Sequence, residues 1–181
     1  MNKIKLSVYL LLTTLSLLTV ESWASSIPEE VSQFVQTNLS DTAKRKFLWL
    51  TGDKKRISSE ILSHPYYKIR ASYWQAADTN RSRSAKTVWV LEEIGKEKFI
   101  TIGVVIEQQK IQALRILKFR ESRGWEVELP SFTKQFEGSQ LNDSKRLTQS
   151  VDGISGATLS VRAVTNIARL ALYLQTTLPN P

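Results

Sequence analysis

The sequence contains no cysteine and only one histidine, and these absences remove several classes of site. Without cysteine there is no disulfide, thiol nucleophile, iron–sulfur cluster or attachment point for c-type haem. The histidine, His64, precedes Pro65, and no cluster of His or Cys residues stands near it to complete a zinc site. We therefore expect no metal centre and interpret His64 as an ordinary loop residue.

The sequence has a single long apolar run, and it lies near the first residue. Residues 6–20 carry no charge, Lys3 and Lys5 precede them, and the small-x-small sequence Ser22-Trp23-Ala24 follows. The run is shorter than the roughly 20 residues that a membrane-spanning helix needs. The pattern predicts a secretory signal peptide over residues 1–24 and a periplasmic protein, with a retained membrane anchor as the alternative.

Basic residues outnumber acidic ones, and this excess of positive charge favours negatively charged binding partners. The formal net charge is +8, and removal of residues 1–24 takes away two lysines and one glutamate, leaving +7. Such a surface favours docking to an acidic redox partner or to anionic lipid heads. We expect no nucleic-acid partner, because the chain has an export signal and no nucleic-acid-binding motif.

The beginning of the predicted mature chain is typical of helices. Ser26 and Glu29 fit a capping box with Pro28 in the first turn, and an apolar helical face follows. Residues 42–50 are interpreted as a second helical piece ending at Gly52, and residues 58–65 as a short helix stopped by proline. We expect residues 25–75 to form a helical region that ends in a first strand over 66–75.

The rest of the chain favours strands followed by a helix. β-Branched and aromatic residues predict strands over 87–94, 99–107 and 110–119, joined by turns short enough for hairpins. Residues 77–86 are interpreted as an exposed loop, 125–129 as a short strand, and Pro130 as the start of a helical turn. Helical periodicity returns over 159–174. The fold class is therefore α+β, with an antiparallel meander packed between N-terminal and C-terminal helices.

Residues 151–160, VDGISGATLS, place two glycines, two serines and a threonine directly before the last helical segment. Asp152-Gly153 is a common turn pair, and Ser155 or Thr158 would serve as an N-cap. No lysine follows the second glycine, which excludes a Walker-type phosphate loop. A serine nucleophile is disfavoured because no histidine follows the segment. A plain helix cap and capture of a phosphate at the helix start both stay open.

The heptapeptide DGISGAT, residues 152–158, resembles the flavinylation motif D-x-x-[ST]-G-A-T of the FMN-binding domain family. The upstream sequence is similar to the family in the same order. Residues 121–124, ESRG, resemble an E-[ST]-x-G loop that often reads E-T-P-G, so Arg123 replaces the proline. Residues 132–138 resemble the F-x-x-Q-F-x-G-like segment. The required motif positions are all matched, by Asp152, Ser155, Gly156, Ala157 and Thr158.

The resemblance implies a covalent cofactor. In this family the last threonine of the motif carries FMN through a phosphoester bond, which places the FMN of this chain on Thr158. A periplasmic flavin transferase would recognise Asp152, Gly153, Ser155, Gly156 and Ala157. The isoalloxazine ring needs apolar walls with a few polar groups, with core packing as the alternative role of each aromatic residue. The candidate contacts are Glu121, Ser122, Gly124, Trp125, Phe132 and Phe136.

The resemblance also implies an activity, with residues 76–181 as the FMN-binding domain. The domain occurs in the C subunit of the sodium-pumping NADH:quinone oxidoreductase and in the G subunit of Rnf complexes. We expect electron transfer between membrane-associated partners, because the chain has no NAD fingerprint and no acid–base pair that would mark a free-standing enzyme. The alternatives are a flavin-dependent reductase of a small acceptor and a non-redox exported binding module.

Overall fold

A five-stranded antiparallel sheet forms the centre of the protein, and the strands follow one another in the order β1-β2-β3-β4-β5. The computed structural model describes residues 27–76 and 85–179. The strands are β1 (Lys44–Trp49), β2 (Arg70–Gln75), β3 (Thr87–Ile94), β4 (Phe99–Glu107) and β5 (Lys110–Lys118). Every neighbouring pair is antiparallel, so the predicted meander is confirmed and extends to β1.

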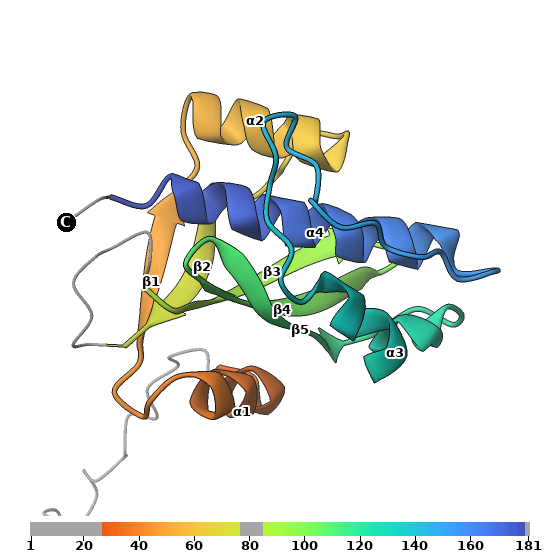
Figure 1. The fold of residues 1–181 in the computed structure, drawn as a ribbon, viewed down its shortest axis with the longest axis horizontal. Helices are drawn as coiled ribbons and strands as arrows, with labels where there is room; N and C mark the ends of the chain where they lie inside the picture. The colour runs from red at the N-terminus through yellow and green to blue at the C-terminus, as the bar shows by residue number, and fades with distance from the viewer. Residues whose placement is uncertain (1–26, 77–84, 180–181) are drawn as a thin grey trace, which may run out of the picture.

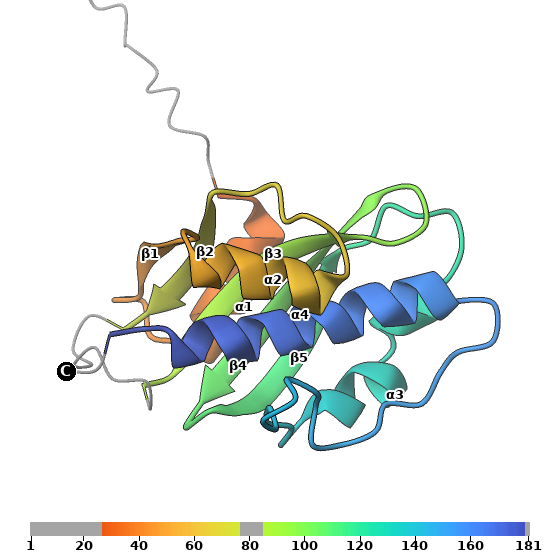
Figure 2. The ribbon, with the colours of Figure 1, turned by 90° about the horizontal axis from the view of Figure 1, so that it is seen from above.

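Helices cover both faces of the sheet, as Figure 1 shows. Helix α1 (Glu29–Asn38) lies on one face, and α4 (Thr158–Thr176) crosses the other with α2 (Asp53–Leu62) beside it (Figures 1 and 2). Three short elements fill the segment after β5: η1 (Trp125–Glu128), α3 (Pro130–Thr133) and η2 (Lys134–Phe136). The arrangement is α+β, as the sequence predicts.

Two clusters of buried side chains hold these layers together. On the α4 side, Trp89 stacks on Tyr73 with ring centroids 4.8 Å apart, and the buried face of α4 packs over them. On the α1 side, Phe34 enters the space left by Gly103, where a Cβ would come within 2.4 Å of its ring. Gly103 therefore lets α1 lie close against the sheet.

The first predicted helical region contains a strand. Residues 42–50 were interpreted above as helical, and this is wrong, because Lys44–Trp49 pair residue by residue with β2. Three consecutive basic residues, Lys44, Arg45 and Lys46, conceal the alternation of a half-buried strand. They are tolerated because β1 is the edge of the sheet, where charged side chains reach water. Both β1 and β2 join the same sheet as β3 to β5.

The predicted strand over 125–129 is also wrong, because these residues form the 3₁₀ turn η1. Gly124 enters the turn with a φ of 83°, and the N–H of Leu129 donates to the Glu126 carbonyl oxygen. Short-range hydrogen bonds thus satisfy this backbone, and only Val127 is fully buried. The helical turn from Pro130 is confirmed as α3.

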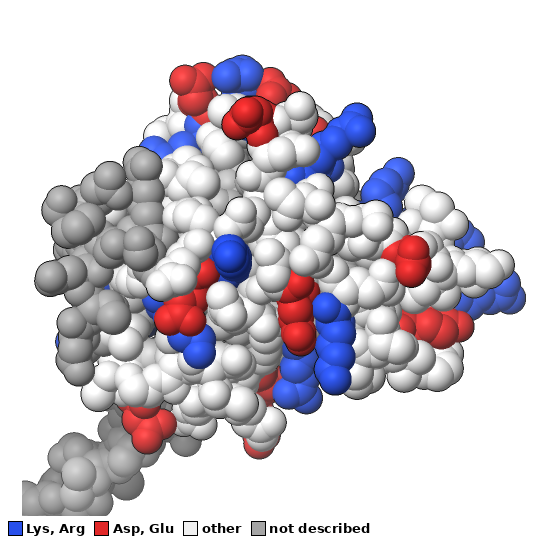
Figure 3. Space-filling view, viewed as in Figure 1, with Lys and Arg blue, Asp and Glu red and all other residues white. Residues whose placement is uncertain are grey.

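Several of the predictions fall on residues that the structure leaves undescribed. The proposed signal peptide, Ser26 of the capping box and most of the loop over 77–86 lie outside the described ranges. Within those ranges, no helix combines the length and the apolarity needed to cross a bilayer. Figure 3 shows lysine and arginine interspersed with acidic residues on the face it displays, which includes α2.

Candidate functional site

The motif over 152–158 forms the loop that leads into α4. Gly156 has a φ of 80°, and the N–H of Ala157 donates to the Ile154 carbonyl oxygen at 3.0 Å. Ala157 is the N-cap, and no side chain caps the helix. The expectation that Ser155 or Thr158 acts as an N-cap is therefore wrong, since Thr158 is already the first helical residue.

The uncapped helix start has a chemical consequence. The N–H groups of the first helical turn have no carbonyl partner inside a helix, and here no side chain supplies one. Thr158 is exposed beside these groups. The positive end of the helix dipole and the free N–H groups favour an anion at this position. A phosphate esterified to Thr158 would complete the helix as a cap does.

The loop after β5 packs directly on this helix start. Gly124 has a φ of 83°, and a Cβ placed on it would lie 2.8 Å from Ser160 Oγ and 3.3 Å from Ala157 Cβ. Only glycine permits such a close approach in this conformation. Residues 121–124 and 156–160 are therefore brought together, although more than 30 positions separate them in sequence.

Glu121 binds the β3–β4 turn to the loop over residues 121–124. Its Oε1 accepts hydrogen bonds from the N–H groups of Lys96, Glu97 and Lys98 at 2.6, 2.8 and 2.9 Å. Desolvation acts most strongly and would raise the pKa of Glu121, but the three N–H donors and the Lys98 charge hold that pKa below its ordinary value. Figure 2 shows the β3–β4 turn, the loop after β5 and the start of α4 at one end of the molecule.

Two adjoining hollows open around the motif. The larger, of about 550 Å³, exposes Thr158, and the smaller, of about 290 Å³, contains Ser155. Lys96 lines the larger hollow, and Arg123 lines both, so two cations stand near the helix start. The hollows share Ser122, Arg123 and Gly156. Together they offer an open surface beside an exposed hydroxyl group, lined by these two cations and by the carboxylates of Glu121 and Glu126.

The candidate aromatic contacts separate into two groups. Trp125 is 55% exposed and lines the smaller hollow. Phe132 and Phe136 are buried in the core, where their rings meet edge to face with centroids 5.5 Å apart. Neither phenylalanine lines a hollow, so core packing accounts for both.

The remaining motif residues, Asp152 and Gly153, lie on the exposed approach to the hollows. The N–H of Asp152 donates to Gln135 Oε1 at 2.7 Å, which ties the motif to the segment before it. The Asp152 side chain is exposed, and a Cβ on Gly153 would meet nothing within 4 Å. This stretch is open to a second protein.

Sequence reasoning missed two residues at this site, Lys96 and Glu126. Lys96 sits in a hairpin turn that is distant in sequence, and nothing in its local pattern marks it. Glu126 lines the smaller hollow, and its Oε2 is buried without a hydrogen-bond partner in the described part of the chain. A buried carboxylate oxygen without a donor is costly and points to a ligand that supplies one.

The geometry thus combines an uncapped helix start, which suits an anion, with open surface beside it. Residues 95–173 match the FMN-binding domain family, and this range spans the β3–β4 turn, the loop over 121–124, the motif and most of α4. The chain therefore contains an FMN-binding domain over residues 95–173. No curated protein sequence matches the chain.

A solved structure is similar in fold. The crystal structure of NqrC from Shewanella oneidensis matches with a TM-score of 0.54 and 15% sequence identity. The match covers 83% of this chain and 85% of the other, so it extends beyond residues 95–173. At this identity the likeness establishes the shared fold.

The residues around the motif fit FMN. The uncapped helix start, with Lys96 and Arg123 nearby, suits a phosphate. The exposed face of Trp125 suits a flat aromatic ring. The unpartnered Glu126 Oε2 suits a hydrogen-bond donor of the ring or of the ribityl chain. The site therefore has a counterpart for each part of the cofactor.

Proposed function

We propose that this protein is an exported flavoprotein that carries FMN as a phosphoester on Thr158 and transfers electrons between membrane-associated partners. The observation that carries the proposal is the placement of Thr158. It is exposed, it begins an uncapped helix, and it lines a hollow together with Lys96 and Arg123. A plain cap residue would instead turn its hydroxyl group back onto the helix.

The residues of the chain have distinct tasks in this proposal. Bound FMN supplies one- or two-electron transfer. The Thr158 oxygen holds the phosphate, while the N–H groups of the first turn and the two cations neutralise its charge. Trp125 provides a wall for the ring. The Glu121 hydrogen bonds keep the β3–β4 turn and the loop over 121–124 in place.

Covalent attachment of FMN and export of the protein from the cytoplasm fit together. A cofactor held by a covalent bond is not lost by dilution outside the cytoplasm, which accords with the signal peptide predicted over residues 1–24. The open approach at Asp152 and Gly153 suits recognition by a periplasmic flavin transferase, which would form the Thr158 ester. The protein mass then rises by that of FMN minus water.

The test is co-expression with a flavin transferase in an exporting host. We expect flavin fluorescence on a denaturing gel and the mass increase of one FMN minus water, with the mature chain starting at Ser25. Thr158→Ala should lose both signals. Thr176→Ala, an exposed threonine at the other end of α4, should keep them and serves as the matched control.

The alternatives have their own signatures in the same experiment. A folded wild-type protein without flavin would support a non-redox binding module and contradict the proposal. Covalent flavin that survives Thr158→Ala would place the ester elsewhere. Steady turnover of a small acceptor with a soluble donor, and without a partner protein, would favour a flavin-dependent reductase.

A further inference from the structure

The outer part of the sheet carries a row of alternating arginine and aromatic side chains. The Arg45 guanidinium lies 5.0 Å from the ring centroid of Phe47 and 5.3 Å from that of Trp74. The Arg70 guanidinium lies 4.1 Å from the Phe47 ring and 5.9 Å from the Trp49 ring. We call these five residues the aromatic–basic ladder.

Strand register places the ladder on the face that carries α1. Arg45 lies opposite Trp74, and Trp49 lies opposite Arg70, so their side chains share a face. Trp74 packs against α1 in the core, but Phe47 is 39% exposed and Trp49 is 56% exposed. The ladder therefore begins under the helix and continues onto open surface. Phe47 and Trp49 thus leave exposed aromatic surface at the sheet edge, and such surface marks sites of interaction.

The ladder is electropositive. Arg45 and Arg70 form no ion pair with the described residues, and Arg45 donates only to the neutral Ser72 hydroxyl group at 3.0 Å. By contrast, Lys68 lies 2.6 Å from Glu92, which also attracts Arg120. The two arginines thus keep charge available for an external anion.

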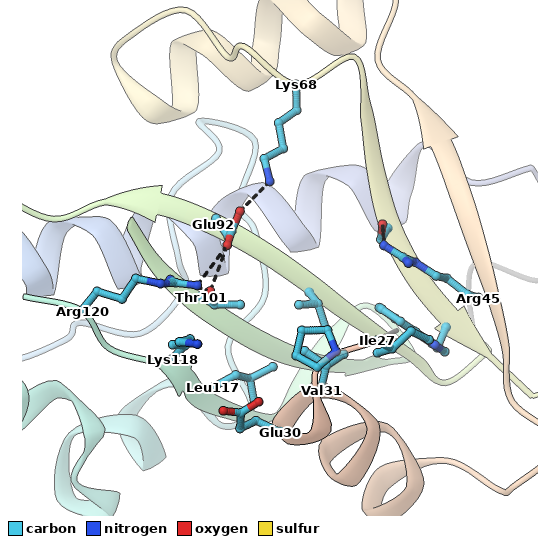
Figure 4. A pocket seen from close by; sticks show the side chains of 14 residues that line it. Ile27, Glu30, Val31, Arg45, Lys68, Glu92, Thr101, Leu117, Lys118 and Arg120 are labelled. Carbon is cyan, nitrogen blue, oxygen red and sulfur yellow. Dashed lines mark hydrogen bonds and ion pairs between the residues drawn. The ribbon is translucent and has the colours of Figure 1, made fainter. Parts of the chain in front are cut away.

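A groove continues from the ladder toward the start of α1 (Figure 4). It has a volume of about 230 Å³ and contains Arg45 and Trp74 of the ladder. Its charged lining comprises four basic residues and two acidic ones, Arg45, Lys68, Lys118, Arg120, Glu30 and Glu92. The groove therefore carries a net positive charge, as the ladder does, and the two form one larger positive surface.

The composition of the ladder and of β1 favours one kind of binding partner over another. A second copy of the chain, paired strand to strand along β1, would gather Lys44, Arg45 and Lys46 of both copies in one short two-stranded segment, and this concentration of positive charge disfavours that interface. Exposed tryptophan combined with arginine is the composition of surfaces that meet lipid headgroups.

We propose that the aromatic–basic ladder docks the protein onto an anionic lipid bilayer. Arg45 and Arg70 contact phosphate groups, and Phe47 and Trp49 enter the headgroup boundary. The flavin hollows lie around the start of α4, on the other face of the sheet, so a docked protein keeps them accessible to redox partners (Figure 1). The proposal does not depend on flavin attachment.

The experiment measures vesicle binding by the exported protein, purified in the same form for each variant. We expect cosedimentation with vesicles of phosphatidylglycerol and phosphatidylcholine in equal parts, and much weaker cosedimentation with phosphatidylcholine alone. Each arginine near such a surface contributes about fivefold to binding. The double variant Arg45→Gln/Arg70→Gln should therefore bind roughly 25-fold more weakly.

A matched double variant distinguishes the effect of charge at the ladder from the effect of the protein's net charge. Lys55→Gln/Arg146→Gln removes the same charge from exposed positions outside the ladder and should bind nearly as wild type. Trp49→Phe should reduce the blue shift of tryptophan emission on vesicle addition while keeping an aromatic ring. Circular dichroism melting confirms that each variant is folded before its binding is compared.

Three results would overturn the proposal. Equal binding to both kinds of vesicle would show that headgroup charge is not recognised. An equal loss in the two double variants would assign the effect to net charge. If the ladder variant lost affinity for polyglutamate but not for the vesicles, the surface would belong to an acidic protein partner instead.

Discussion

Gly124 lies against Ser160 so closely that a Cβ on Gly124 would stand 2.8 Å from the Ser160 hydroxyl oxygen. This contact joins the loop after β5 to the first turn of α4. It places Arg123, which lines the hollow with Thr158, and Trp125, which lines the adjoining hollow, near the start of α4. The contact between two small residues thus positions the larger groups of the candidate site.

Gly124→Ala should destabilise the fold and impair flavin attachment. The φ of 83° costs a residue with a Cβ about 1–2 kcal/mol, and the contact with Ser160 adds to that cost. Urea denaturation gives the change in unfolding free energy, and in-gel fluorescence gives the attached flavin. Gly153→Ala is the control for the unfolding measurement, since a Cβ there meets nothing within 4 Å. Equal stability of the two variants would contradict the close packing of the loop.

Glu121 should make the site sensitive to acid. Its pKa in the folded protein lies below the ordinary value, so its stabilising effect is present at neutral pH and is lost as the pH falls through the folded pKa. We expect the urea midpoint of the wild type to decrease below about pH 4.5. Glu121→Gln should lack this part of the pH dependence. Parallel curves for the two proteins would exclude a role for the Glu121 carboxylate.

His64 should respond to pH in the opposite direction. Its Nε2 lies 2.6 Å from Oε1 of Glu93. The Glu93 hydrogen bond raises the pKa of His64, against desolvation and the charge of Arg162. A raised pKa gives stability that is present below the unfolded value of about 6.5 and is lost as the pH rises through the folded pKa.

An NMR titration measures this pKa directly, because His64 is the only histidine of the chain. We expect a titration midpoint above 6.5 in the wild type. The urea midpoint should fall as the pH rises through it, and His64→Gln should remove that decline. A midpoint below 6.5 would mean that the contact with Glu93 does not form in solution.

The fold was most predictable where the pattern of apolar and polar residues reflects which side chains are buried. Strands β3, β4 and β5 alternate or are apolar throughout, and their short turns leave little choice of pairing. Strand β1 was missed because an edge strand can hold three cations, so its sequence lacks the pattern of a half-buried strand. Residues 125–129 were wrongly predicted as a strand because their apolar and polar residues alternate. In the structure only Val127 of this segment is buried, and the segment forms a 3₁₀ turn instead of pairing with a strand.

The candidate site was predictable only in part. Thr158 and the loop over 121–124 follow from ordered motifs that resemble a family. Phe132 and Phe136 share the neighbourhood in sequence, yet both lie buried in the core. Lys96 and Glu126 reach the hollows through tertiary packing of a hairpin turn and a 3₁₀ turn. Local sequence does not encode such contacts.

Glu126→Gln should raise the reduction potential of the attached flavin. A buried carboxylate beside the ring opposes the arrival of an electron, and an amide of the same shape removes that charge. A shift on the order of 30 mV, about 1.4 kcal/mol for two electrons, is expected. Spectroelectrochemical titration of the flavinylated protein measures it. Glu128→Gln, an exposed neighbour on η1, is the control and should leave the potential unchanged. An equal potential in all three proteins would show that Glu126 does not face the ring, and its buried oxygen would then need another donor.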